Sequence, residues 1–149
     1  MVESSTPDEA TVVLSLTVDA EADAVFTTFT DPGRLAAWYW PASYAALYET
    51  DPRPGGRFTF RSTGLPSGQN IAVRGIYGEI RRPELLTFIW AWDGDFSPFT
   101  QVSVEIKALD SGSSVLVTHS QNMTEQQRDD HLKGWHDCLT RLVEHLAVD

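Results

Sequence analysis

The chain has 149 residues, a length at which one domain with a single core is expected. Its 11 Lys and Arg are outnumbered by 21 Asp and Glu, and the net charge of -10 repels polyanions, so we expect neither nucleic acid nor an anionic membrane as a partner. A single cysteine excludes an intrachain disulfide, and no apolar run is long enough for a membrane span, which together predict a cytoplasmic protein.

The first ten residues have no hydrophobic periodicity. We therefore expect a flexible N-terminus over residues 1–10 and a single domain over residues 11–149. The domain begins with a strand, because apolar residues alternate with other residues from Val12 to Val18, the period of two that is typical of a half-buried strand.

Two short helices are predicted after this strand. Apolar residues recur at spacings of three and four from Glu21 to Phe29, and Asp19 is placed to cap the N-terminus of that helix. The second helix starts at Thr30-Asp31-Pro32, where either polar side chain can accept backbone N–H groups and the proline occupies the first helical position. Leu35 and Trp38 are expected to face inward.

Most of the remaining chain has the composition of strands separated by turns. The segment Arg53–Gly56 (RPGG) is expected to form a tight turn. The predicted strands are Arg57–Arg61, Ile71–Ile80, Leu86–Trp92 and a hairpin of Val102–Lys107 with Val115–His119.

The last element is the longest predicted helix. Thr124 and Gln127 fit a capping box, and an apolar stripe follows them. The stripe comprises Leu132, Trp135, Leu139, Leu142, Val143 and Leu146. Since strands and helices do not alternate, the element order favours a mostly antiparallel α+β fold over a parallel sheet.

Six segments of the chain, in the same order, resemble stand-alone homologues of the C-terminal domain of the heat-shock-protein-90 ATPase activator. They are Val18–Trp38 (VDAEADAVFTTFTDPGRLAAW), Glu49–Phe58 (ETDPRPGGRF), Gly75–Ile80 (GIYGEI), Pro83–Trp92 (PELLTFIWAW), Val117–Ser120 (VTHS) and Gly134–Trp135. The resemblance spans nearly the whole chain. It implies the helix-grip fold of START lipid-transfer domains and the birch-pollen allergen, in the SRPBCC superfamily. That fold is a curved antiparallel sheet of about six to seven strands around a long C-terminal helix, with two short helices after strand one.

A helix laid across a curved sheet encloses a space between the inward strand faces and the helix stripe. The chain has 5 Trp, 4 Tyr and 7 Phe, and aromatic side chains line apolar ligand cavities as well as filling cores. We predict a non-enzymatic binding domain that holds an apolar or aromatic small molecule. The predicted ligand-binding residues are Trp38, Phe58, Phe60, Tyr77, Phe88, Trp90, Trp92, Val117, His119, His131 and Trp135.

Two groups of polar residues have alternative interpretations. His119 shares a strand face with apolar residues, so it is either a buried neutral imidazole or a group that orients a ligand or acts as a base. Glu49 and Asp51, two residues apart, are either an exposed acidic edge or an acid/base pair.

No metal site or catalytic motif is predicted. His131 and His136 are five residues apart, whereas zinc-binding helices place their ligands three or four apart. Cys138 has no flanking pattern of an activated nucleophile, and we expect a small core residue there. We therefore predict no catalytic residue, no metal and no cofactor.

Two other functions remain open from the sequence. The resemblance implies a chaperone-associated interaction protein with a chaperone as its partner, and His119 with a carboxylate could serve a cyclase or hydrolase. The expected oligomeric state is a monomer or a homodimer.

Overall fold

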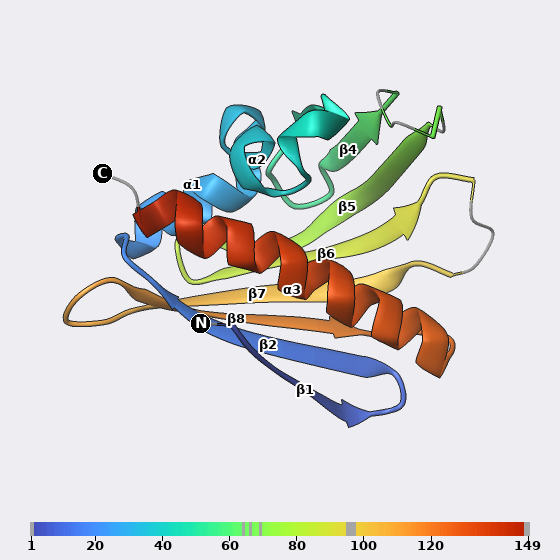
Figure 1. Ribbon diagram of the computed structural model, residues 1–149. Coiled ribbons are helices and arrows are strands. Elements are labelled where there is room, and N and C mark those ends of the chain that lie inside the picture. The colour runs from blue at the N-terminus through green and yellow to red at the C-terminus, as the bar shows by residue number, and fades with distance from the viewer. Residues whose placement is uncertain (1, 64, 66, 69, 95–97, 148–149) are drawn as a thin grey trace.

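A computed structural model describes residues 2–63, 65, 67–68, 70–94 and 98–147 of the chain. An antiparallel sheet of eight strands in the order β1-β2-β8-β7-β6-β5-β4-β3 curves around one long helix (Figure 1). The strands are β1 Glu3–Asp8, β2 Thr11–Val18, β3 Leu47–Thr50, β4 Arg57–Ser62, β5 Ile71–Arg81, β6 Leu85–Trp92, β7 Thr100–Ala108 and β8 Ser113–Ser120. The helices are α1 Ala22–Thr30, α2 Pro32–Trp38, the 3-10 helix η1 Ala42–Tyr44 and α3 Glu125–Ala147. The predicted α+β helix-grip fold is confirmed.

The sheet has eight strands where six to seven were predicted, and the two strands that were not delimited from the sequence are β1 and β3. We predicted a flexible segment over residues 1–10, but Glu3–Asp8 pairs antiparallel with β2 in the structure. All six residues of β1 are exposed, so the strand is held by its backbone ladder and not by buried side chains. A search for hydrophobic alternation cannot detect such a strand.

The two short helices after β2 are present, and one of their two predicted caps is wrong. Asp19 does not cap α1: Glu21 occupies the N-cap position, and no side-chain hydrogen bond is made there. The cap of α2 is confirmed, since the Asp31 carboxylate accepts a hydrogen bond from the backbone N–H of Arg34, and Pro32 lies in the first turn.

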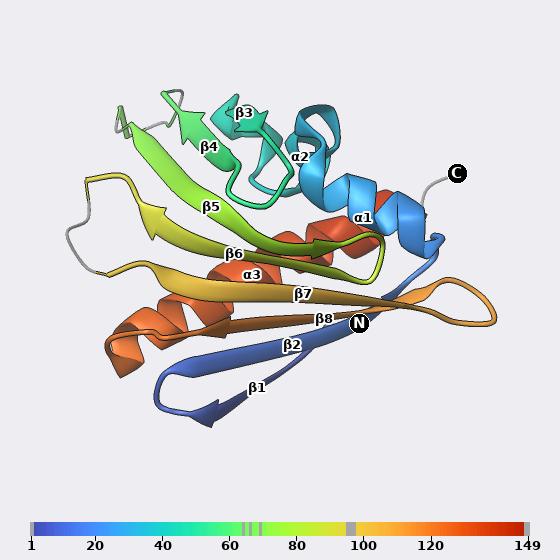
Figure 2. The same cartoon turned by 180° about the vertical axis from the view of Figure 1, so that it is seen from behind.

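Helix α3 begins with the predicted capping residues. The backbone N–H of Gln127 donates to the Thr124 hydroxyl over 3.0 Å, and the Gln127 side chain accepts from the backbone N–H of Met123. From there the helix runs diagonally across one face of the sheet (Figure 1). Figure 2 shows the opposite face of the sheet, with α3 behind the strands. Among the helices of the described residues, none combines the length and the hydropathy needed to cross a bilayer.

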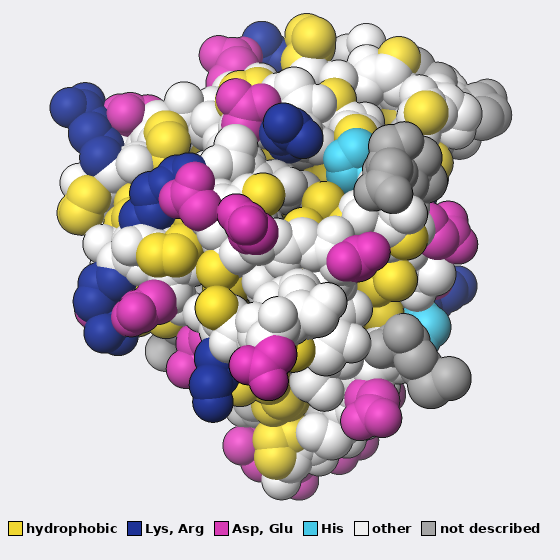
Figure 3. Space-filling model, turned by 90° about the vertical axis from the view of Figure 1, so that its left-hand side faces the viewer, with side chains coloured by type: hydrophobic (Ala, Val, Ile, Leu, Met, Phe, Trp, Pro, Cys, Tyr) yellow, Lys and Arg dark blue, Asp and Glu magenta, His cyan; other side chains and the backbone are white. Residues whose placement is uncertain are grey.

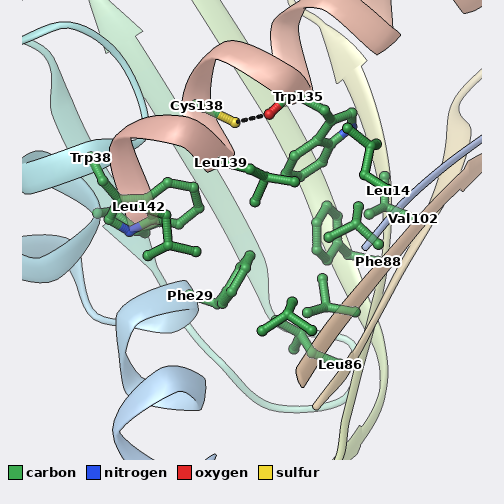
Figure 4. Close-up of a cluster of buried hydrophobic side chains, with 14 of the residues drawn as sticks. Leu14, Phe29, Trp38, Leu86, Phe88, Val102, Trp135, Cys138, Leu139 and Leu142 are labelled. Atoms are coloured by element: carbon green, nitrogen blue, oxygen red, sulfur yellow. Dashed lines mark hydrogen bonds between the residues drawn. The ribbon is translucent and has the colours of Figure 1, made fainter. Parts of the chain in front are cut away.

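The core lies between α3, the two short helices and the inner face of the sheet (Figure 4). Trp38 is its largest fully buried side chain, and the Trp38 indole N–H donates to the Thr28 carbonyl over 3.0 Å. Phe29 meets the Trp38 ring edge-on at 5.0 Å between centroids. Leu139 and Leu142 of the helix stripe are fully buried against this cluster, so this end of the interface is closed.

Candidate functional site

The other end of the same interface contains a pocket of about 260 Å³. It lies between the middle of α3, the C-terminal end of β6, the end of β8 and the segment that follows α2. This volume is larger than the roughly 150 Å³ apolar cavity that is known to accept benzene. The pocket therefore has room for a ligand of one or two rings.

Helix α3 supplies one side of the pocket through residues at helical spacing. His131, Gly134, Trp135, Cys138 and Arg141 all line it, because positions three and four apart share a helix face. Gly134 differs from the other four, since a Cβ atom at that position would meet no atom within 4 Å. The missing side chain leaves open space in the wall, although glycine in a helix costs about 1 kcal/mol relative to alanine.

Aromatic rings form the facing walls. The indoles of Trp40 and Trp92 are parallel within 2°, with centroids 6.4 Å apart, and Trp92 is 37% exposed. Trp90 is buried beneath them and meets Trp92 edge-on at 5.1 Å between centroids. The walls are thus flat and apolar, a surface that suits a planar ligand.

His119 lies deep in the site with both ring nitrogens engaged. The Trp135 indole N–H donates to Nδ1 over 2.9 Å, so Nδ1 must carry a lone pair. The proton of the neutral ring is therefore on Nε2, which donates to the Thr100 hydroxyl over 2.6 Å, and that hydroxyl donates to the Trp90 carbonyl over 3.1 Å. Burial and then the neighbouring His131 hold the pKa of His119 well below its usual value.

His131 stacks on His119, with ring centroids 4.2 Å apart, and leaves one nitrogen unused. The Asn122 amide nitrogen donates to the carbonyls of Ala10 and His119, so the amide oxygen faces His131. Nδ1 of His131 donates to that oxygen over 2.6 Å, which places the lone pair on Nε2. Burial lowers the pKa of His131 to about 4, against the opposing charge of Asp130.

Two further polar groups in the pocket wall have no ordinary hydrogen bond. The Trp90 indole N–H is buried and finds no partner within the part of the chain that the structure describes. The Tyr39 hydroxyl is its polar neighbour, but the two groups do not have the geometry of a hydrogen bond. Burial raises the pKa of Tyr39 far above its usual value, nearby Cys138 adds to this rise, and the Trp90 indole offsets a part of it, so the phenol stays protonated.

Cys138 and Arg141 have structural partners. Burial raises the pKa of the Cys138 thiol to about 12, which keeps it protonated and unreactive. The Arg141 guanidinium donates to the carbonyls of Trp38 and Tyr39 at 2.9 Å each, which ties α3 to the C-terminal end of α2.

The structure divides the predicted ligand-binding residues into two groups. The first group lines the pocket: Trp90, Trp92, His119, His131 and Trp135. The second group is packed in the core and lines no part of the pocket: Trp38, Phe58, Phe60, Tyr77, Phe88 and Val117. Four members of the second group, with Trp135, surround a residual void of only about 20 Å³, which is too small for an organic ligand.

The remaining polar candidates lie away from the pocket. Glu49 forms an ion pair with Arg61 and Asp51 with Arg53, on exposed side chains at the β3 edge. This placement matches the interpretation as an acidic edge. Within the described residues, no group of three His, Cys, Asp or Glu side chains is arranged to hold a metal ion.

Sequence reasoning missed several residues of the pocket, of which Tyr39, Trp40 and Gly134 matter most. Gly134 carried a usable signal, because an isolated glycine inside a strongly periodic helix often has a packing or functional reason. Tyr39 and Trp40 lie just beyond a short helix, where periodicity gives no direction for a side chain.

Comparison with known proteins gives the chain its family. The model of the family described as "Activator of Hsp90 ATPase homolog 1-like protein" matches residues 19–147. Comparison with curated protein sequences finds no match.

Several solved structures share the fold at low sequence identity. Protein Ms6760 from Mycobacterium smegmatis is 20% identical, with a TM-score of 0.81 and coverage of 99% of this chain and 97% of that one. Protein CV1439 from Chromobacterium violaceum is 22% identical, with a TM-score of 0.81 and coverage of 94% and 99%. CalU16 from Micromonospora echinospora is 22% identical, with a TM-score of 0.74 and coverage of 99% and 87%. Because the family model covers nearly the whole chain, this protein belongs to the family of Activator of Hsp90 ATPase homolog 1-like proteins.

Proposed function

We propose that this protein is a binding domain that holds an apolar or aromatic small molecule in the pocket between α3 and the end of the sheet. The observation that carries the proposal is an aromatic pocket of about 260 Å³ beside a core that is otherwise closed. Small-molecule sites are concave and mostly apolar, with a small number of polar groups that orient the ligand. The pocket has this composition.

Gly134 supports the proposal independently of the pocket volume. A larger side chain at this helical position would stabilise α3, and it would meet open space and not a neighbouring atom. The stability of the helix therefore does not explain the glycine. An open pocket mouth does, because Gly134 lines the pocket and is exposed, so a longer side chain there would lie over the mouth.

A solved structure of similar fold also supports a small-molecule binding role. DynU16, a protein of the dynemicin biosynthetic locus, matches with a TM-score of 0.76 at 21% identity, over 95% of this chain and 48% of that one. A locus for the synthesis of a small molecule is a setting in which a small-molecule carrier is useful. At this identity the likeness concerns the fold, so the ligand of this chain is argued from its own pocket.

The test uses a pair of variants at one position. Gly134→Phe would place a ring at the mouth of the pocket and obstruct it, and Gly134→Ala would add only a methyl group. We expect a thermal-shift screen of mono- and bicyclic aromatics to give hits with the unmodified protein and with Gly134→Ala, and none with Gly134→Phe. A ligand at a hundredfold excess over its Kd adds about 2.7 kcal/mol of stability, which such a screen detects. Hits that survive Gly134→Phe would place the ligand elsewhere and overturn the proposal.

A chaperone-associated role is the second candidate, and the family description favours it. Figure 3 shows acidic and basic side chains interspersed with small groups of hydrophobic ones on one face of the molecule, so that face offers no field of a single sign. Co-purification with a chaperone that persists in Gly134→Phe would support this role, since it uses a surface and not the pocket. The hydrolase or cyclase alternative lacks its base at His119, because both ring nitrogens of His119 are bonded to the protein.

A further inference from the structure

Three polar groups of the pocket wall have hydrogen-bonding capacity that the described protein does not use. They are the Trp90 indole N–H, which can only donate and has only a weak contact with the Tyr39 hydroxyl, Nε2 of His131, which can only accept, and the proton of the Tyr39 hydroxyl. Leaving a buried N–H unpaired costs about 1–3 kcal/mol. These groups line one pocket, so a single ligand atom can satisfy more than one of them.

We infer that the pocket selects an uncharged aromatic molecule that carries a hydroxyl group, whose oxygen accepts from the Trp90 indole and whose proton is donated to Nε2 of His131. This inference rests on the proposed function and names the ligand class of the same pocket. The Trp90 and His131 rings lie 5.0 Å apart, centroid to centroid, and are perpendicular within a few degrees, at 87°. The two rings are in edge-to-face contact, so a ligand oxygen placed where they meet in the pocket wall would lie next to both.

Residues behind the pocket wall determine which atoms of this subsite donate and which accept hydrogen bonds. Asn122 holds the proton of His131 on Nδ1, because its amide nitrogen is committed to two backbone carbonyls and only its oxygen faces the ring. His119 cannot relay a proton to the ligand, since Trp135 and Thr100 occupy its two nitrogens. The subsite therefore presents one fixed acceptor and one fixed donor.

Charged ligands fit this pair of groups less well. An ammonium group has no acceptor for the Trp90 N–H, and a carboxylate has no proton for Nε2 of His131. The Asp130 and Asp137 carboxylates also line the pocket and repel an anion. Arg141, the cation among the described lining residues, is committed to the backbone carbonyls of Trp38 and Tyr39.

The aromatic part of the ligand follows from the walls around these polar groups. Trp40 and Trp92 present parallel rings at the entrance, and Trp92 is partly exposed. A planar ring can pack against them while its hydroxyl reaches Trp90. The volume of about 260 Å³ limits the ligand to about two fused rings.

The experiment compares three probes of nearly equal shape: 2-naphthol, 2-methoxynaphthalene and naphthalene. We expect 2-naphthol to bind about tenfold more tightly than naphthalene, because a net hydrogen bond contributes up to about 1.5 kcal/mol. The methoxy compound accepts from Trp90 but cannot donate to His131, so it should lose most of this gain. In ¹H–¹⁵N spectra of the unmodified protein, the Trp90 indole proton should shift downfield with 2-naphthol and not with naphthalene.

Matched variants locate the preference. Trp90→Phe removes the N–H and keeps a ring, so the ratio of affinities for 2-naphthol and naphthalene should fall clearly below that of the unmodified protein, with only the bond to His131 remaining. Trp92→Phe changes a wall ring without touching the polar pair, so the ratio should persist. The spectra give an answer even if Trp90→Phe fails to fold.

Two results separate this inference from the proposed function. Equal affinity for all three probes, with binding still blocked by Gly134→Phe, would overturn the hydroxyl preference and leave the binding domain in place. Absence of binding for every probe, or binding that Gly134→Phe does not affect, would overturn both.

Discussion

The two ends of the α3–sheet interface are built from the same kinds of residue and have opposite character. At the end near α1 and α2, Trp38 is fully buried with its indole N–H bonded to a backbone carbonyl, and the void among the neighbouring core rings is only about 20 Å³. At the end near the start of α3, Trp90 is buried with its indole N–H unpaired and borders a pocket of about 260 Å³. The paired indole N–H of Trp38 belongs to the end with a structural role. The unpaired indole N–H of Trp90 belongs to the end that is available to a ligand.

Removing the core tryptophan should give the largest effect on stability. Trp38→Ala leaves a large cavity and the Thr28 carbonyl without its donor, so we expect a loss of about 3–5 kcal/mol in the free energy of unfolding, measured by urea denaturation. Trp92→Ala is the control at the pocket end, because Trp92 is partly exposed and should cost much less. Similar losses for both variants would contradict the division of the interface into two ends.

Acid should lower the free energy of unfolding through the buried histidine His131 at the pocket end. The pKa of His131 is about 4 in the folded protein against 6.5 for the unperturbed group, so the unfolded chain binds more protons between these values. The contribution of His131 to the free energy of unfolding is fully present above about pH 6.5. It is lost as pH falls toward 4, and the loss from this one group is at most roughly 3 kcal/mol. Urea denaturation at a series of pH values measures it.

A pair of histidine variants separates this effect from the titration of carboxylates. His131→Gln should reduce the pH dependence between 6.5 and 4, with His119, whose pKa is also depressed by burial, supplying the remainder, and the exposed His136→Gln is the matched control. A pH dependence that is identical in both variants would show that His131 is not the group responsible.

Breaking the chain of hydrogen bonds from His119 through Thr100 to the Trp90 carbonyl should lower the free energy of unfolding by less than the preceding changes. Thr100→Val preserves the shape of the side chain but leaves Nε2–H of His119 and the Trp90 carbonyl without their partner. We expect a loss of about 1–3 kcal/mol in the free energy of unfolding. Thr118→Val, on the strand next to His119 and half-buried, is the control without such a role, and it should change stability little.

The smallest effect has the opposite sign. Gly134→Ala should raise the free energy of unfolding by about 1 kcal/mol, because alanine has the better helix propensity and its methyl group meets open space. Thermal or urea denaturation detects this increase. A destabilised Gly134→Ala protein would mean that the pocket wall tolerates no added atom.

The architecture could be predicted because periodic patterns of apolar residues and local capping residues identify most of its strands and helices. The alternation in β2, the Asp31 cap of α2 and the stripe of α3 each follow from local chemistry, and the structure bears them out. Strand β1 was not predicted, because a strand held only by its backbone ladder has no side-chain pattern. Asp19 was a wrong cap because several polar residues precede α1 and sequence alone does not select among them.

The position of the pocket could not be predicted from the same patterns. Strand alternation identifies which residues face inward, and it assigned Phe88 and Trp90 to the same face correctly. It does not say that α3 packs tightly against one part of that face and leaves a gap at another. That outcome depends on side-chain volumes summed over the helix and the strands that face it, and on Tyr39 and Trp40, which belong to no periodic element.

The two hydrogen bonds from Arg141 to the carbonyls of Trp38 and Tyr39 have a mechanical consequence. They fasten the segment that carries the Trp40 wall to the same helix that carries the opposite wall. An oversized guest therefore cannot gain room by swinging that segment outward unless both bonds break. The two bonds thereby limit the width of the ligand that the pocket can accept.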